Sequence, residues 1–117
     1  MPPEARKLLA DMLNAAEAVQ HFVAGKTLDN LRIDDVLRSS VYFKFVIMGE
    51  ALAKLRRSFP TVADQITESR RIVAFRNQII HGYGLIDDEI TWRIIEAKVP
   101  VLVQELVALL ASASADF

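Results

Sequence analysis

Apolar residues that recur at every third or fourth position constrain the fold of this chain more than any other feature. The longest pattern runs from residue 33 or 34 to residue 58 and contains Leu37, Val41, Phe45, Met48, Leu52 and Leu55. This spacing places the apolar side chains on one face of an α-helix. No segment alternates with the period of two that is typical of a half-buried strand. The sequence therefore predicts an all-α protein.

Four segments carry the helical pattern. We expect helices at 3–23, from 33 or 34 to 58, from 67 or 68 to about 81, and from 87 or 88 onward. Residues typical of turns occupy 24–31 and 59–66, so we expect loops there. Pro100 removes one backbone donor from the last helix and should kink it. The expected architecture is a four- to five-helix bundle whose fourth helix is kinked at Pro100.

Composition limits the size, charge and location of the protein. The chain has 117 residues, 52% of them hydrophobic, and we expect one domain over 1–117 with a single core. The net charge of -1 comes from 14 basic and 15 acidic residues, so any nucleic-acid site must be local. The absence of cysteine excludes disulfides and thiolate metal sites. No apolar run approaches the roughly 18 residues of a membrane span, so we expect no membrane contact and a cytoplasmic location.

One pair of side chains has a spacing that could serve a metal. Glu17 and His21 are four residues apart on the predicted first helix, which can place two ligands on one face. The chain has only two histidines and lacks the Glu-x-x-His pairs of a di-metal carboxylate bundle. A solvated helix pair is therefore the favoured interpretation. We expect neither a metal nor a cofactor.

An arginine in the middle of an apolar arc marks the predicted third helix. At about 100° per residue, Arg76 shares its arc with Ile72, Val73, Phe75, Ile79 and Ile80. The opposite arc contains Arg70, Arg71, Asn77, Gln78 and His81. A guanidinium keeps its charge and is costly to bury unless an anion or several acceptors meet it. We therefore expect a negative group to approach Arg76.

The side chains available for chemistry suit few reactions. The sequence has no Gly-rich phosphate loop after a strand, no Ser-His-Asp arrangement on a suitable turn and no carboxylate cluster dense enough for magnesium. Arg76, Asn77, His81 and Tyr83 remain. They suit metal-independent RNA cleavage, because the substrate supplies its own 2′-hydroxyl as nucleophile. His81 can transfer a proton near neutral pH, and Arg76 can hold a phosphate with two hydrogen bonds.

Polar residues on the second helix leave alternatives open. Glu50 precedes Lys54 by one turn, and this spacing alone favours an exposed ion pair over a carboxylate that orients Arg76 or His81 from the facing helix. Arg38 similarly precedes a tyrosine by one turn. A pairing with Glu50 would make Arg76 a structural residue. His81 could likewise be a polar helix-end residue that interacts with the helix dipole.

The third-helix residues also carry a resemblance to a known family. The pattern Arg76-Asn77-x-x-x-His81-x-Tyr83 resembles the signature of HEPN domains, and its downstream tyrosine resembles the HepT branch. The resemblance covers nearly the whole chain, because Arg38, the Met-Gly-Glu-Ala run at 48–51, Trp92 and Pro100 are also similar to that branch. The chain departs from the branch at 68–71 and 74–75, where members often carry Pro-Trp and Gly-Met. These departures leave the motif positions intact.

The resemblance implies an activity and partners. HepT-like proteins are dimeric helical bundles in which the arginine and histidine of both subunits line a cleft that cleaves RNA without a metal. They are typically paired with a small MntA-like nucleotidyltransferase antitoxin, which adenylylates the motif tyrosine and blocks the cleft. By this resemblance Arg76 and His81 are catalytic and Tyr83 is the modification site. The supporting residues are Asn77, Glu50 and Arg38.

The expected function is therefore that of a metal-independent endoribonuclease toxin in a type VII-like toxin–antitoxin pair. It would act as a homodimer on RNA, with tRNA among the candidate substrates. The alternative is a non-catalytic helical docking or substrate-recognition subunit of a minimal nucleotidyltransferase. Both hypotheses predict a bundle, a dimer and the same partner, and they differ in ribonuclease activity.

Overall fold

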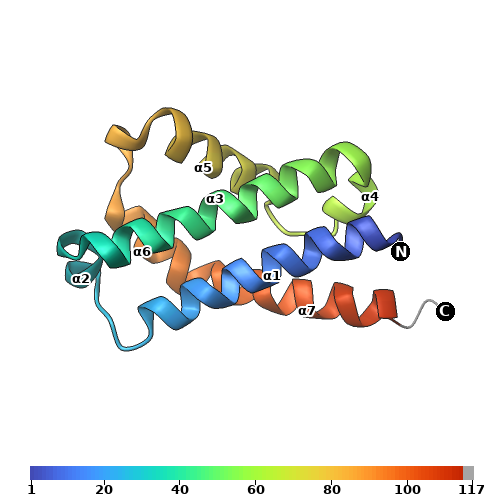
Figure 1. The fold of residues 1–117 in the computed structure, drawn as a ribbon, viewed down its shortest axis with the longest axis horizontal. Coiled ribbons are helices and arrows are strands. Elements are labelled where there is room, and N and C mark those ends of the chain that lie inside the picture. The colour runs from blue at the N-terminus through green and yellow to red at the C-terminus, as the bar shows by residue number, and fades with distance from the viewer. Residues whose placement is uncertain (115–117) are drawn as a thin grey trace.

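Two long antiparallel helices form the centre of the fold. The computed structural model describes residues 1–114 and contains, within that range, α-helices and one 3₁₀ turn but no strand. The elements are α1 (Pro3–Val23), α2 (Leu28–Ile33), α3 (Asp35–Ser58), α4 (Pro60–Ala63), α5 (Ser69–His81), η1 (Tyr83–Leu85), α6 (Asp88–Ala97) and α7 (Val99–Ser114). In Figure 1, α3 lies between α1 and α5, while α7 runs along α1 on the other side. The all-α prediction is confirmed, but residues 1–114 form seven α-helices where four or five were expected.

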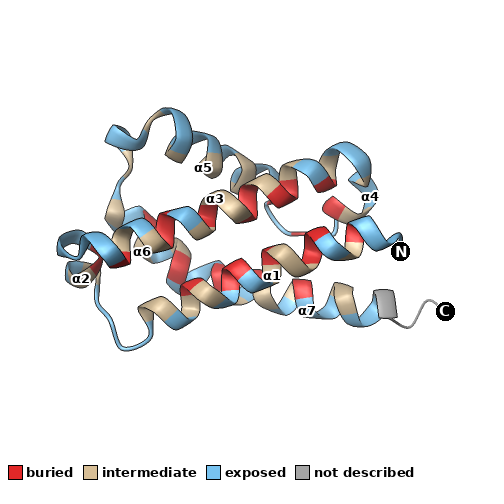
Figure 2. Ribbon diagram, viewed as in Figure 1, coloured by how far each residue is buried: buried red, intermediate tan, exposed pale blue. Residues whose placement is uncertain are grey.

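The core lies where α1, α3 and α7 face one another. Its largest fully buried aliphatic side chains include Leu9, Met12, Val19, Val41, Met48, Leu52, Leu55 and Leu106. Figure 2 shows the buried positions as stripes on the facing sides of these helices, as the period of three to four predicts. Burying each such side chain contributes about 1.5–3 kcal/mol. This packing holds α3 in place, and α5 packs on the side of α3 that faces away from α1.

The segment 24–31, expected to be a loop, is a loop only as far as Thr27, and α2 begins at Leu28. The Thr27 side chain accepts a hydrogen bond from the Asn30 backbone N–H, and the Asn30 side chain accepts one from the Thr27 N–H. This reciprocal cap stabilises a short helix that apolar periodicity does not reveal. The second expected loop, 59–66, similarly contains the single turn of α4, which starts at Pro60.

The expected break in the last helix is present. Helix α6 ends at Ala97 and α7 begins at Val99, so Pro100 lies in the first turn of the second piece. A proline tolerates this position because the first backbone N–H groups of a helix have no partner inside the helix. The break changes the direction of the chain, which Figure 1 shows as an angle between α6 and α7. Across the described residues, no helix is both long and apolar enough to cross a bilayer.

Candidate functional site

Helix α5 crosses α3 where Gly49 faces Arg76. A Cβ atom on Gly49 would overlap the Arg76 Cβ and lie 2.6 Å from the Arg76 Cγ. The absence of a side chain on Gly49 therefore lets the stem of Arg76 pack directly on the α3 backbone. Next to this crossing, the rings of Phe75 and Phe45 pack edge to face, with their centroids 5.2 Å apart. The crossing fixes where α5 presents its polar side chains.

The guanidinium of Arg76 is bound by Glu50. Its Nη2 donates a hydrogen bond to Glu50 Oε1, and its Nη1 donates one to Asn77 Oδ1 at 2.6 Å. The Arg76 side chain is 21% exposed and the Glu50 side chain 43% exposed, so the pair lies at the edge of the bundle. The negative group expected near Arg76 is thus Glu50 on the facing helix.

The spacing of Glu50 and Lys54 favoured an exposed ion pair within α3, and the structure shows that this interpretation is wrong. Glu50 does not pair with Lys54 along its own helix; it reaches across to α5 and orients Arg76. The periodicity of one helix cannot reveal a partner on another helix, which explains the wrong preference. The other nitrogen of the Arg76 side chain, Nε, is buried without a hydrogen-bond partner.

The two arcs predicted for α5 are confirmed except at Ile80, which was placed on the apolar arc but is 42% exposed. The apolar arc packs on the core through Ile72, Val73, Phe75 and Ile79, which are partly buried. The polar arc is exposed and consists of Arg70, Arg71, Asn77, Gln78 and His81. Figure 2 shows the corresponding alternation of partly buried and exposed positions along α5. One face of α5 is therefore fixed by α3, while the other faces solvent.

His81 and Tyr83 lie where α5 ends. His81 is the last residue of the helix, and the Gly82 N–H donates to the Gln78 carbonyl at 2.8 Å to close it. The chain then turns through η1, so the Tyr83 ring does not stack above Arg76 as it would on a continuous helix. Tyr83 is 77% exposed, and His81 is also exposed. Within residues 1–114, no hydrogen bond or ion pair joins His81 to Arg76.

Arg38 belongs to a separate polar cluster. Its Nε donates to both carboxylate oxygens of Asp88 at 3.1 Å, and its guanidinium lies 4.9 Å from the centroid of the Tyr42 ring. The Tyr42 hydroxyl donates to Asp88 Oδ1 at 2.6 Å and forms a second hydrogen bond with Thr91 Oγ1 at 2.8 Å. This cluster joins α3 to the first turn of α6. It lies about three helical turns before Glu50 along α3, so the structure does not bring Arg38 together with Arg76.

The electrostatics of this cluster follow from its burial. Burial of the phenol, reinforced by the hydrogen bond to Asp88, raises the pKa of Tyr42 well above its ordinary value near 10. The hydrogen bond to Asp88 raises the pKa of Arg38. The sequence did not predict the cluster that joins Tyr42 to Asp88 and Thr91. The one available signal was the spacing of Arg38 and Tyr42, which places both on one face of the helix.

Comparison with known proteins supplies a family. Residues 12–109 match the family described as "Ribonuclease HepT-like". The chain belongs to this family. The resemblance inferred from the α5 motif is thereby confirmed, and it extends over most of the HepT-like chain.

Two relatives from Methanocaldococcus jannaschii are similar to this HepT-like chain. One, named "Putative RNase MJ0127", is 27% identical over 103 residues, which are 88% of this chain and 84% of the relative. The other, named "Gamma-glutamylcyclotransferase and putative RNase MJ0434", is 23% identical over 110 residues, or 94% of this chain. The matched region is 49% of that second relative, so this chain spans about half of its length. No solved structure matches the chain significantly.

The candidate metal ligands of the HepT-like chain do not gather into a cluster. Among residues 1–114, no group of three or more histidine or acidic side chains could hold a metal ion. Glu17 and His21 both lie exposed on α1.

Proposed function

We propose that this HepT-like chain is a metal-independent endoribonuclease toxin that acts as a homodimer. The observation that carries the proposal is the setting of the family motif on α5. Arg76 is held in place by Glu50 at the crossing of two helices, and His81 is exposed five residues later at the helix end. Family membership supplies the reaction class, and the motif supplies the groups that the reaction needs.

The position of Arg76 supports a role in phosphate binding. Glu50 and Asn77 each take one N–H of the guanidinium, which has five. The terminal nitrogens therefore keep two further N–H groups, one each, in a fixed and partly exposed orientation. Such a fork suits two non-bridging oxygens of a phosphodiester. Glu50 would act as a positioning residue, because it orients Arg76 and does not itself contact the substrate.

The proposed reaction is an internal transesterification. His81 removes the proton from the 2′-hydroxyl of the RNA, and the 2′-oxygen attacks the adjacent phosphorus. As the new O–P bond forms, the bond from phosphorus to the 5′-oxygen breaks, and the partner's His81 donates a proton to that oxygen. Arg76 stabilises the added negative charge on the phosphorane. The products are a 2′,3′-cyclic phosphate and a 5′-hydroxyl.

Surface features near Glu50 support the dimer. Within residues 1–114, no hydrogen bond or ion pair joins His81 to Arg76, and in the proposed dimer these groups of two copies meet at one cleft. A groove of about 480 Å³ between α1 and α3 includes Phe43, Ile47 and Glu50 in its lining. Phe43 is 61% exposed, and Val36, two turns earlier on α3, is 78% exposed. A second copy seated on this groove would cover Phe43 and lie directly beside Glu50, the partner of Arg76.

The exposure of Tyr83 supports its proposed modification. A partner nucleotidyltransferase would transfer an adenylyl group from ATP, as the Tyr83 hydroxyl oxygen attacks the α-phosphate and pyrophosphate leaves. The ring is 77% exposed, so the hydroxyl is accessible to another protein. The added nucleotide would lie two residues from His81 and carry negative charge. It would therefore repel and obstruct an RNA backbone.

The ribonuclease test uses the two histidines of the chain. Purified wild type is incubated with tRNA and other RNAs in EDTA, and the ends are analysed for 2′,3′-cyclic phosphate. We expect cleavage by wild type and by His21→Ala, whose histidine is exposed on α1. His81→Ala should keep the fold and the dimer but lose cleavage by about 100-fold or more. Equal activity of the two variants would contradict the catalytic role of His81.

The modification test is separate. Co-expression with the nucleotidyltransferase should add one or more adenylyl masses to the peptide that contains Tyr83, and Tyr83→Phe should abolish the addition. Suppressed toxicity with an unmodified peptide would instead indicate neutralisation by binding alone.

One observation favours the alternative function of a docking subunit. The Arg76 guanidinium already has protein partners in Glu50 and Asn77, as a structural arginine would. In this alternative the chain recognises or presents substrates for a nucleotidyltransferase and cleaves nothing. Wild type and His81→Ala would then be equally inert on every RNA, although both would bind the partner.

A further inference from the structure

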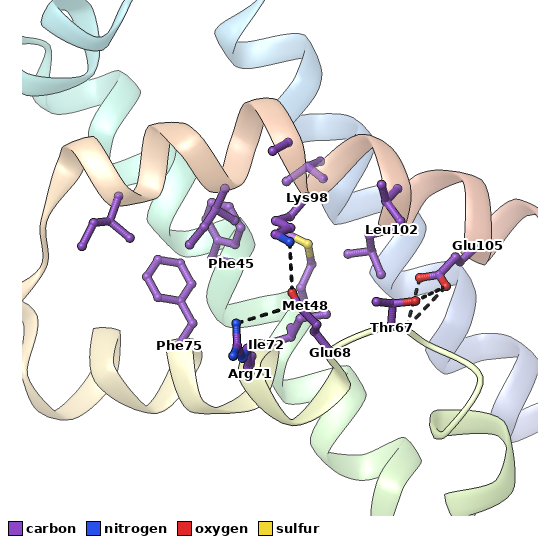
Figure 3. Close-up of a pocket in the computed structure, with 15 residues that line it drawn as sticks. Phe45, Met48, Thr67, Glu68, Arg71, Ile72, Phe75, Lys98, Leu102 and Glu105 are labelled. Carbon is purple, nitrogen blue, oxygen red and sulfur yellow. Dashed lines mark hydrogen bonds and ion pairs between the residues drawn. The ribbon is translucent and has the colours of Figure 1, made fainter.

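An apolar cavity lies on the side of α5 that α3 does not cover. It occupies about 460 Å³ between α5 on one side and α6 and α7 on the other, and Phe45 and Met48 of α3 also line it. Figure 3 shows Phe75 and Ile72 reaching into it from α5, opposite the chain from α6 into α7. Protein interiors contain few voids larger than a water molecule, whereas ligand sites have volumes of this order. The cavity is therefore a candidate binding site, separate from the motif residues.

The polar groups that line the cavity gather at one end. Glu68 lies between two cations, with Oε1 3.4 Å from Arg71 Nη1 and Oε2 3.5 Å from Lys98 Nζ. Beside them, Thr67 donates to Glu105 through its hydroxyl at 2.7 Å and through its backbone N–H. Figure 3 shows these contacts as dashed lines at the end of the cavity away from Phe75. The remaining lining is apolar, so the cavity has one polar end and one apolar end.

Glu68 holds its carboxylate at this end from an unusual backbone position. It has φ 56°, the one positive φ found outside glycine among the described residues. A residue with a Cβ adopts this left-handed region at an energetic cost, and such residues occur often at functional sites. The geometry therefore places one carboxylate between two cations at the mouth of an apolar cavity.

We propose that this cavity binds a small amphipathic carboxylate, such as a medium-chain fatty acid. The apolar chain lies among Phe75, Ile72 and the aliphatic residues of α6 and α7. The carboxylate binds Arg71 and Lys98 in competition with Glu68. Both cations are well exposed, at 82% and 59%, and within residues 1–114 they share a single carboxylate partner, Glu68. Glu68 and its two cations together carry a net charge of +1, whereas the Glu105 carboxylate accepts hydrogen bonds from Thr67 and forms no ion pair with Arg71 or Lys98.

The first test measures how affinity depends on the ligand. Calorimetric titrations of the full chain use octanoate, decanoate and decanol below their aggregation limits. Decanoate should bind more tightly than octanoate by about four-fold for each added methylene, which is the factor that burial of one methylene predicts. Decanol should bind at least about five-fold more weakly than decanoate, because a hydroxyl cannot replace a carboxylate between two cations. No measurable decanoate binding would overturn the proposal.

The second test changes two charged side chains at the polar end of the cavity one at a time. Lys98→Gln should weaken decanoate by about five-fold or more and leave decanol unchanged. Glu68→Gly should strengthen decanoate, because it removes the competing carboxylate and also relieves the left-handed backbone. Decanoate binding that responds to neither variant would overturn the proposed head-group site.

A filling variant tests whether the chain enters the cavity. Ala97→Phe should abolish binding of decanoate and decanol, since Ala97 lines the cavity and is exposed. Ala108→Phe is the matched control, because Ala108 is exposed on α7 but does not line the cavity. Circular dichroism checks that both variants fold. Equal loss in both variants, or in neither, would show that decanoate binds elsewhere.

Discussion

Gly49 lies directly against Arg76, and no other residue type fits between α3 and the arginine stem. Two effects oppose each other in Gly49→Ala. Alanine favours a helix by about 1 kcal/mol over glycine, but its Cβ would overlap the Arg76 Cβ, which is fixed to the backbone and cannot rotate away. Overpacking of this kind costs about 1–3 kcal/mol, so we expect a net loss of stability. Urea unfolding measures it.

Gly84→Ala provides the control for this substitution. A Cβ on Gly84 would meet no atom within 4 Å. The free energy of unfolding of Gly84→Ala should therefore match that of wild type within about 0.5 kcal/mol. If Gly49→Ala is also neutral or stabilising, α3 and α5 can move apart to admit the methyl group, and the close contact of Gly49 with Arg76 is not required for stability.

The second prediction concerns the energetic coupling of Glu50 and Arg76. In a double-mutant cycle with alanine at each position, we expect a coupling of about 1 kcal/mol, because the pair is only partly buried. The exposed pair Lys7–Asp11, whose side chains are 75% and 40% exposed, should couple by about 0.3–0.5 kcal/mol. Urea unfolding of both cycles tests the ranking. A coupling of Glu50 and Arg76 no larger than that of Lys7 and Asp11 would argue against a positioning role for Glu50.

The third prediction separates the two tyrosines of the chain. Tyr42→Phe should lower the free energy of unfolding by about 1–3 kcal/mol, because it leaves the buried partners of the hydroxyl without a hydrogen bond. Tyr83→Phe should change it by less than about 0.5 kcal/mol, because the Tyr83 side chain is exposed. Thermal or urea unfolding at neutral pH measures both. A similar loss in the two variants would contradict the structural role assigned to the Tyr42 cluster.

The same tyrosine predicts a dependence on alkaline pH. Burial raises the pKa of Tyr42 in the folded protein above its ordinary value near 10. The folded state therefore retains the phenol proton where the unfolded state loses it, so this contribution to stability is complete below pH 10 and declines as pH rises further. Wild type should lose stability between about pH 10 and 11 more steeply than Tyr42→Phe. Parallel curves for the two proteins would show that Tyr42 is not the group responsible.

The sequence predicted those parts of the fold that depend on a single helix. Periodicity located the long helices and the two arcs around Arg76, because both depend on residues three and four positions apart. It missed α2, since the Thr27 cap is completed by Asn30 where glutamate or glutamine is usual. Glu50 and Asp88 were harder to assign, because each carboxylate meets an arginine on another helix. Such pairings depend on how two helices cross, and the apolar periodicity within a single helix does not determine that crossing.

The last prediction tests whether the planar guanidinium of Arg76 serves chemistry as well as structure. Arg76→Lys keeps a positive charge for Glu50 but replaces a rigid fork with a single ammonium, which cannot bind Glu50, Asn77 and two phosphate oxygens together. We expect kcat/KM for RNA cleavage to fall by about 100-fold or more. The free energy of unfolding should change by only about 1 kcal/mol. Arg70→Lys, on the exposed arc of α5, should retain cleavage within about three-fold, which corresponds to less than 1 kcal/mol. If Arg76→Lys cleaves RNA as well as Arg70→Lys does, then Arg76 only joins α5 to α3, and the phosphate must be bound by other groups.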